Sequence, residues 1–321
     1  MKQALQQITQ PISTEICAFK EAYQAALQSE NSLLSQMIDH VTKSSGKQMR
    51  PMLVLLCAKL CGGVTQETLH AAVAIELLHV ASLIHDDVID ESDQRRGYPS
   101  LYAKFQSKAS VLGGDYFLST ALSEAVKTNN LDVVSQIASM GRVLVDGELL
   151  QLSNSKNAIY KESDYFSIIK AKTAALFCTC TTLGTLTGTA HTAQDIEYAK
   201  QLGTAIGICF QLKDDIFDYQ KGEDVGKPIG NDIQEGKMTL PLLHVYEQAT
   251  ENEKQAIKQA FANKDTNYIQ ALVVERGGIQ YTNEKIEFYK QEALRILQCF
   301  EDSPTRDAIK QFILLVANRS K

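Results

Sequence analysis

The chain has 321 residues, 44% of them hydrophobic and 22% charged, so it can bury a sizeable core, and a disordered chain is excluded. The net charge of −6 at pH 7 gives no general attraction to nucleic acid or to an anionic membrane, and we expect no nucleic-acid partner. An anionic substrate therefore needs a local cluster of basic side chains.

The N-terminal residues 1–13 are rich in glutamine and lack the apolar segment of a secretory signal. The seven cysteines, an odd number, indicate reduced thiols, and we expect a cytoplasmic protein. Cys57 and Cys61 are one helical turn apart, with His70 beyond them, so a zinc site is an alternative. The Leu and Ala neighbours favour core thiols instead.

Helical periodicity dominates the chain. Residues 66–90 are apolar nearly all round, which predicts a central helix with neighbours on every side. Residues 173–190 carry little charge and are about long enough to cross a bilayer, but seven threonines and two glycines favour a buried helix over a transmembrane segment. Residues 196–219 show the period of an amphipathic helix, and Thr192 with Asp195 forms a capping-box pattern before it.

The six prolines lie at plausible helix boundaries, and Asn-Gly turns between alternating strands are missing. No repeat, linker or low-complexity tract divides the chain. We therefore predict an all-α bundle formed by one domain, residues 1–321.

Two copies of one acidic pattern stand out: Asp86-Asp87-Val88-Ile89-Asp90 and Asp214-Asp215-Ile216-Phe217-Asp218. The first and last aspartates of each copy are four residues apart and share a helix face, about 6 Å apart along the axis. Carboxylates so placed repel one another unless a cation lies between them, and Mg²⁺ suits few carboxylates plus phosphate oxygens. A solvated acidic face is the alternative. If the two helices run side by side, the carboxylates face across one apolar-walled cavity.

Basic residues accompany these motifs and can satisfy the other oxygens of a diphosphate. Lys47 and Arg50 are three residues apart, and Arg95 and Arg96 follow the first acidic motif. We expect Lys172 and Thr173 to begin a helix, where a hydroxyl and exposed N–H groups can meet an anion. Lys227 and Lys237 follow the second motif on a glycine-containing loop.

Six motifs in order carry a family resemblance: GKQMRP, HVASLIHDDVIDESDQRRG, VLGGDYFLS, KAKTAALF, FQLKDDIFDY and GKPIGNDIQEGKMTLPLL. With them the chain resembles the trans-type polyprenyl diphosphate synthases, such as the octaprenyl and heptaprenyl enzymes and farnesyl diphosphate synthase, over about residues 43–243. The resemblance implies an isoprenoid-synthase helical bundle with a central cavity, a homodimer, and Mg²⁺-dependent condensation of isopentenyl diphosphate with an allylic diphosphate.

The resemblance also implies roles for individual residues. Isopentenyl diphosphate is expected to bind Lys47, Arg50, His79 and Arg96. The allylic diphosphate is expected to bind Arg95, Lys172, Thr173, Gln211, Lys227 and Lys237. Asp86, Asp90 and Asp214 are expected to bind Mg²⁺, with Asp87, Asp215 and Asp218 acting through water or in support, and these six aspartates and Lys172 form the expected catalytic set. His79 also fits a satisfied core histidine, and Lys237 lies one residue farther from Lys227 than in the farnesyl synthases.

Product length is predicted from the residues below the first motif. Ser82 is four residues before Asp86, and Ala81 stands beside it. Farnesyl-length members of the resembling family place an aromatic ring there, whereas both residues here are small. We therefore expect a product longer than C15, in the range C30–C40 of a quinone side-chain precursor. The alternative is a short-chain farnesyl or geranylgeranyl synthase, in which a bulky residue such as Phe117 closes the tunnel.

Other classes of protein share part of this pattern. A class I terpene cyclase has one such aspartate motif but no second one and no GKQMRP site. A non-catalytic partner subunit of a synthase is expected to have lost aspartates or arginines, whereas both motifs are intact here. A helical cation-binding scaffold does not explain the paired basic motifs.

Overall fold

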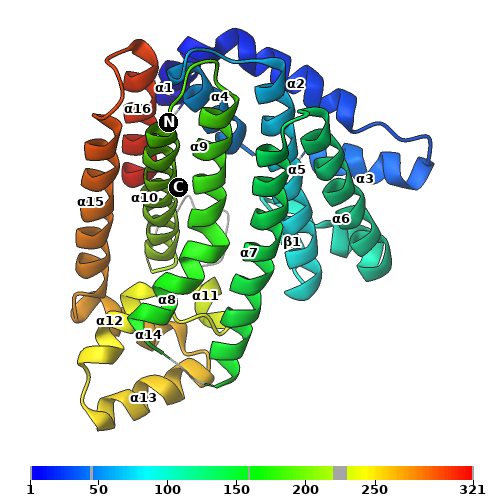
Figure 1. Cartoon of the computed structure of the whole chain (residues 1–321). Coiled ribbons are helices and arrows are strands. Elements are labelled where there is room, and N and C mark those ends of the chain that lie inside the picture. Colours follow the sequence, from blue (N-terminus) through cyan, green and yellow to red (C-terminus); the bar gives the residue numbers. More distant parts are fainter. Residues whose placement is uncertain (1, 44–45, 158–159, 220–229, 320–321) are drawn as a thin grey trace. The chain divides into compact units, whose positions relative to one another are not determined.

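The computed structural model describes residues 2–43, 46–157, 160–219 and 230–319, and it confirms the predicted all-α class (Figure 1). The first elements are α1 (Lys2–Thr9), η1 (Gln10–Ile12), α2 (Ser13–Ala26), α3 (Ser32–Lys43), α4 (Met49–Leu60), α5 (Gln66–Ile89), β1 (Gln94–Arg95), β2 (Tyr98–Pro99), α6 (Leu101–Lys127) and α7 (Leu131–Lys156). They are followed by α8 (Glu162–Ile169), η2 (Lys170–Ala174), α9 (Ala175–Thr187), α10 (Ala193–Phe217), α11 (Asn231–Gln234), α12 (Leu240–Gln248), α13 (Glu251–Ala262), α14 (Thr266–Glu275), α15 (Gly278–Leu297) and α16 (Pro304–Asn318).

The described chain forms two compact units. The first unit contains Met1–Arg142, Leu176–Gly203 and Ile296–Phe312, and the second contains Val143–Ala175, Thr204–Arg295 and Ile313–Lys321. Several long helices therefore contribute residues to both. The single domain expected from the sequence stays a prediction, and each unit is described by itself.

Helix α5 is the centre of the first unit, as the sequence predicted. It packs against α2, α4 and α6, and most of its residues are buried. Its start is fixed by a reciprocal cap, because Thr65 Oγ1 accepts from the Thr68 N–H at 3.1 Å and Thr68 Oγ1 accepts from the Thr65 N–H at 3.1 Å. Among the described residues, α5 is the one helix long and apolar enough to cross a membrane by length and composition, and two thirds of that stretch is buried in the fold, as in a core helix.

Small residues bring three helices of the first unit close together. A Cβ on Gly184 of α9 would lie 2.3 Å from the backbone oxygen of Val54 in α4, and a Cβ on Gly203 of α10 would lie 2.3 Å from Thr181 Oγ1 in α9. The Thr181 hydroxyl donates to the Ala199 carbonyl oxygen at 2.6 Å. The hydroxyls of Thr179, Thr181 and Thr187 therefore bond within the fold, and the predicted buried helix is confirmed over Ala175–Thr187.

The second unit is built around the C-terminal half of α10. Ile208, Leu212 and Ile216 repeat every four residues and pack with apolar residues of α8, α12 and α15. At the other end of α10 the predicted capping box is present, because Thr192 N donates to Asp195 Oδ2 at 2.8 Å and Asp195 N donates to Thr192 Oγ1 at 3.2 Å. The second aspartate motif therefore lies at the C-terminal end of α10, which is a core helix.

A short hairpin was missed by the sequence analysis. β1 pairs antiparallel with β2 directly after the first aspartate motif. The turn residues Arg96 and Gly97 have φ values of 54° and 79°, the left-handed region that two-residue hairpins require at both positions. The expectation that hairpin signals are missing is therefore wrong here, because the turn uses Arg-Gly in place of Asn-Gly.

Candidate active site

A cavity of about 260 Å³ in the second unit contains four of the six predicted residues of the allylic site, Lys172, Thr173, Gln211 and Lys237. Its polar lining includes Lys172, Thr173, Gln211, Asp215 and Lys237. These side chains come from η2, α10 and the segment after α11. The structure therefore brings together five residues that are far apart in sequence. Lys227 lies outside the described residues.

Lys172 and Thr173 do not begin a helix, so that expectation is wrong. They lie in the π-helical turn η2, which continues from α8 into α9, and the Ala175 N–H donates to the Lys170 carbonyl oxygen. Their backbone N–H groups therefore do not form a helix N-terminus. A π turn inserts one residue into a helix and re-aims its side chains, which is a frequent device at functional sites.

The π turn places Lys172 against α7. Its ammonium pairs with Glu148 and donates to Gln151 Oε1 at 3.1 Å. A Cβ on Gly147 would lie 3.0 Å from Lys172 Cγ and 2.8 Å from the Ala171 Cβ, so only glycine admits this approach without a shift. The lysine is therefore held at the cavity wall by a carboxylate and an amide oxygen of α7.

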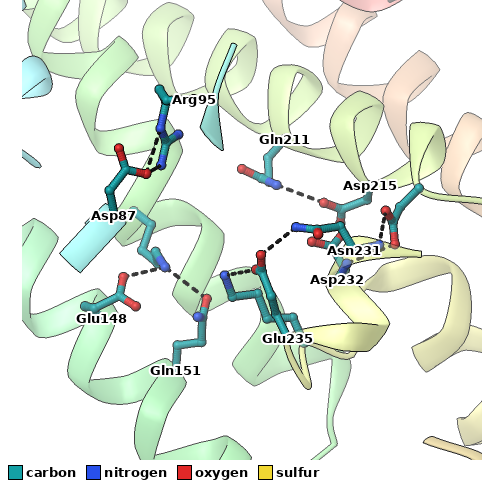
Figure 2. A network of polar contacts seen from close by, with 12 residues as sticks. Asp87, Arg95, Glu148, Gln151, Gln211, Asp215, Asn231, Asp232 and Glu235 are labelled. Carbon is teal, nitrogen blue, oxygen red and sulfur yellow. Dashed lines mark hydrogen bonds and ion pairs between the residues drawn. The ribbon is translucent and has the colours of Figure 1, made fainter. Parts of the chain in front are cut away.

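Asp215 is the buried centre of a hydrogen-bond network (Figure 2). It accepts from the Tyr165 hydroxyl and from Gln211 Nε2, the latter at 2.8 Å, and Thr173 Oγ1 donates to Gln211 Oε1 at 2.7 Å. Burial raises the pKa of Asp215 to about 7, although the hydrogen bonds from Tyr165 and Gln211 oppose that rise. Thr173 and Gln211 thus support Asp215 in this structure.

Asp218 has a structural contact that its motif did not reveal. Its carboxylate accepts from the Asn231 N–H at 2.8 Å and from the Asp232 N–H at 3.1 Å, so it fixes the start of α11. Asp232 in turn lines the same cavity as Asp215, and the sequence analysis missed it. Burial and the nearby charges of Asp215 and Asp218 raise the pKa of Asp232 well above its usual range. The signal available was its position between Lys227 and Lys237.

Lys237 places an ammonium group near Asp232. Its ammonium pairs with Glu235 at 2.5 Å, and its charge opposes the rise in the pKa of Asp232. The cavity of the second unit therefore combines two ammonium groups with two carboxyl groups that burial tends to keep protonated.

Asp214 is held by a residue from the C-terminal end. Arg319 Nη2 lies 2.8 Å from Asp214 Oδ1, while 44% of the Asp214 side chain is exposed. This arginine was not among the predicted site residues, because it belongs to none of the six motifs.

A second pocket lies in the first unit along one face of α5. Its lining includes Glu76, His79, Asp87, Arg95 and Arg96. The three α5 residues follow helical spacing and so share a face. Arg95 Nε and Nη2 donate to Asp87 Oδ1 at 2.9 and 2.5 Å (Figure 2). Arg95 was expected to bind the allylic diphosphate, and in this structure it holds the middle aspartate of the first motif.

Three arginines of the first unit lie close enough to His79 to act on it through their charge. A Cβ on Gly46 would lie 2.5 Å from Arg96 Nη1, so the glycine makes room for that guanidinium. Arg50 lies over the Phe177 ring at 5.6 Å, whereas Lys47 is exposed. Burial and the charges of Arg50, Arg96 and Arg95 hold the pKa of His79 well below its usual range. His79 is therefore neutral and buried inside a cationic pocket.

Asp86 and Asp90 end α5 on one helix face, as predicted. The Asp90 N–H donates to the Asp86 carbonyl oxygen at 2.8 Å, the normal helical bond. Within the described residues no three acidic, histidine or cysteine side chains gather into a closed metal cluster. Mg²⁺ binds through one or two carboxylates and keeps water and phosphate oxygens as its other ligands, so paired carboxylates at a helix end fit this ion.

The two predicted chain-length residues differ in their surroundings. Ala81 is buried, and Ser82 is half-buried with its hydroxyl donating to the His79 carbonyl oxygen at 2.9 Å. Phe117 is fully buried in α6. Nearby, a Cβ on Gly114 would lie 2.2 Å from His85 Nε2, and one on Gly113 would lie 2.5 Å from Met37 Cε, so the two glycines of VLGGDYFLS let α6 pack on α5 and on α3.

The part of the chain that contains the six motifs also matches known proteins. Residues 31–274 match the family described as Polyprenyl synthetase. The octaprenyl diphosphate synthase of Escherichia coli (strain K12) is 33% identical over 311 residues, which is 95% of this chain and 96% of that one.

Two solved structures extend the similarity to the fold. A geranylgeranyl pyrophosphate synthase from Bacteroides thetaiotaomicron is 40% identical with a TM-score of 0.85, covering 99% of this chain and 100% of the other. A polyprenyl synthase from Caulobacter crescentus CB15, complexed with calcium and isoprenyl diphosphate, is 28% identical with a TM-score of 0.92, covering 98% of each chain. The chain therefore belongs to the polyprenyl synthetase family, and the resemblance to the trans-polyprenyl diphosphate synthases is confirmed.

Proposed function

We propose that this member of the family is a Mg²⁺-dependent enzyme that condenses isopentenyl diphosphate head-to-tail with an allylic diphosphate, through the residues described above. The observation that carries the proposal is the cavity of the second unit, which Lys172 and Lys237 line together with Asp215 of the second motif and Asp232. Two ammonium groups in one cavity supply the charge-assisted hydrogen bonds that a diphosphate requires.

The allylic diphosphate is assigned to this cavity. Lys172 exchanges Glu148 and Gln151 for phosphate oxygens, and Lys237 exchanges Glu235. The Tyr165 hydroxyl donates a hydrogen bond to Asp215, so the carboxyl group keeps its place when the ligand enters. Lys227 is expected to add a third ammonium group.

Isopentenyl diphosphate is assigned to the first unit. Arg96 and His79 line its pocket, and Arg50 acts on the same pocket through its charge. Neutral His79 can donate one N–H to a phosphate oxygen without adding a charge. Lys47, which is exposed, is expected to reach the diphosphate from outside.

Asp86, Asp90 and Asp214 are the residues that would hold the metal. Mg²⁺ supplies positive charge that offsets the charge growing on the leaving diphosphate. The calcium and isoprenyl diphosphate of the Caulobacter crescentus relative support a divalent cation beside a diphosphate in this family. A cation held there before reaction would need no reorganisation when charge develops.

The proposed reaction separates charge. The allylic C–O bond breaks to give a delocalised carbocation and a diphosphate, which Lys172 and Lys237 stabilise. The double bond of isopentenyl diphosphate, held by Arg50 and Arg96, then forms the new C–C bond before water can react. Loss of a proton to the departed diphosphate restores an allylic product, so the cycle can repeat.

Product length is proposed to exceed C15 and to fall in the range C30–C40. Small Ala81 and Ser82 below the first motif support it, as does the octaprenyl product named for the Escherichia coli relative. The geranylgeranyl product named for the Bacteroides thetaiotaomicron relative supports the shorter alternative.

A homodimer in the cytoplasm is part of the proposal. Helix α6 exposes a row of apolar side chains at Val111, Leu112, Leu122 and Val126, with Leu112 69% exposed and Val126 61% exposed. Positions 111, 122 and 126 recur at whole helical turns and form a stripe that a second copy can cover. Sedimentation of the purified protein at about twice the chain mass supports this assignment, and a monomer contradicts it.

Pyrophosphate release distinguishes the rival activities. Purified protein with Mg²⁺ should release pyrophosphate when isopentenyl diphosphate and farnesyl diphosphate are both present, and a chelator should stop it. A terpene cyclase would release it from the allylic diphosphate alone. A non-catalytic subunit or scaffold would release none under any of these conditions.

A further inference from the structure

Arg319, directly after α16, reaches the second aspartate motif. Its Nη2 lies 2.8 Å from Asp214 Oδ1 and donates to the Phe210 carbonyl oxygen at 2.8 Å. The guanidinium lies over the Phe210 ring at 3.9 Å and near the Phe217 ring at 5.5 Å. All these groups belong to the second unit, so one side chain ties the end of α16 to the end of α10.

The guanidinium is fixed by its surroundings. Only 14% of the Arg319 side chain is exposed, and its Nε is buried with no hydrogen-bond partner among the described residues. Ring stacking and the carbonyl contact leave a planar group few alternative orientations. Placing a desolvated guanidinium beside a carboxylate that is 44% exposed gains little from the ion pair itself, because solvent screens the exposed partner. The arrangement therefore fits a role other than stability.

We infer that Arg319 is a positioning residue, which fixes the Asp214 carboxylate through Oδ1 and leaves Oδ2 to bind the divalent cation. The inference rests on the proposed metal role of Asp214. A free aspartate at a helix end samples several rotamers, and each metal-binding event must then select one of them. The fixed Arg319 guanidinium beside Asp214 Oδ1 restricts the Asp214 side chain to one of these rotamers.

A counter-ion role predicts the opposite result. If Arg319 only neutralised Asp214 until the metal arrived, its removal would expose a full negative charge and tighten metal binding. If it orients Asp214, its removal should weaken metal binding about 10- to 100-fold, the usual cost of losing a residue that positions a metal ligand. The two roles therefore predict opposite changes in the Kd for the divalent cation.

The test is a titration of the full chain with MnCl₂ alone, followed by the electron paramagnetic resonance signal of free Mn²⁺. Arg319→Gln should raise the Kd about 10- to 100-fold, and Arg319→Lys should give an intermediate Kd because an ammonium keeps the charge without the planar fork. Arg276→Gln removes a surface arginine that pairs with Glu253 in the same unit, and it should bind like the wild type.

Asp214→Ala separates this inference from the proposed function. If Asp214→Ala loses Mn²⁺ while Arg319→Gln binds as tightly as the wild type, or more tightly, the positioning role is overturned and the metal site stands. If Asp214→Ala also binds like the wild type, or the wild type binds no Mn²⁺, the metal role of Asp214 is wrong and the inference falls with it. Circular dichroism melting of Arg319→Gln and Arg319→Lys identifies a variant that has lost its fold.

Discussion

The two aspartate motifs have the same sequence pattern but different surroundings. In the first motif, the middle aspartate Asp87 is held by a guanidinium, that of Arg95. In the second, the middle aspartate Asp215 is held by a phenol and an amide, those of Tyr165 and Gln211. An identical pattern therefore does not imply identical hydrogen-bond partners.

Both middle aspartates are buried, so the difference follows from their partners. Asp87 accepts from a cationic group, whereas Asp215 accepts from neutral donors, and burial raises the pKa of Asp215 to about 7. The last aspartates also differ, because Asp90 ends a helix at the surface while Asp218 binds the backbone of α11. The first motif therefore ends in the exposed Asp90, whereas the second holds Asp215 and Asp218 in a buried network and leaves Asp214 half-exposed.

The largest expected effect comes from removing the outer ligands. Asp86→Ala and Asp214→Ala should each lower the turnover of condensation by at least about a hundredfold, because each variant loses a metal ligand. Steady-state kinetics in Mg²⁺ buffer measures the loss, and circular dichroism checks the fold. If Asp86→Ala alone kept near wild-type turnover, the metal would be bound by the second motif and not by the first.

The two basic pockets should respond to different substrates. Lys47→Ala and Arg50→Ala should raise the KM for isopentenyl diphosphate about ten- to a hundredfold, since each removes a charge-assisted hydrogen bond. Lys172→Ala should instead raise the KM for the allylic substrate and lower kcat. Initial rates with each substrate varied in turn measure these constants. The same effect on both substrates in all three variants would contradict the division.

Chain length should change without loss of activity. Ser82→Phe places a ring one turn below Asp86, and the product should shorten toward C15 or C20 while turnover persists. Ala81→Phe should act in the same direction but with lower stability, because Ala81 is buried and overpacking costs about 1–3 kcal/mol. Chromatography of the products measures the length. An unchanged distribution in both variants would show that the chain grows elsewhere.

The smallest expected effect is on acid stability. The pKa of His79 is held well below its usual range, so the unfolded chain binds a proton near pH 6.5 that the folded chain does not. The folded state therefore loses stability as the pH falls below about 6.5 and keeps this contribution above it. The Tm of the wild type should fall more between about pH 7.5 and 5.5 than that of His79→Gln. Parallel decreases in Tm would place His79 outside the acid response.

Local patterns in the sequence predicted the main helices correctly. The apolar run of α5 and the Thr192–Asp195 cap of α10 depend on neighbouring residues, so periodicity and capping rules detect them. The π turn at Lys172 could not be predicted in this way, because it depends on the close approach of Gly147.

The partners of the aspartates depend on contacts between distant segments. Tyr165 and Arg319 lie far from the second motif in sequence, and neither has a local pattern that marks it. Asp232 lay inside a quoted motif, yet its place in the cavity follows from the α11 start that Asp218 fixes. The chemistry of the site was therefore readable from the motifs, whereas the support of each carboxylate required the fold.

The most direct test of the account is the product of the wild-type enzyme. Purified protein should be incubated with Mg²⁺, farnesyl diphosphate and labelled isopentenyl diphosphate, and the hydrolysed products separated by chain length. We expect labelled products in the range C30–C40 that disappear when Mg²⁺ is chelated. A chain that yields no labelled prenyl product with Mg²⁺ present, or one that forms it equally well after chelation, would contradict the account.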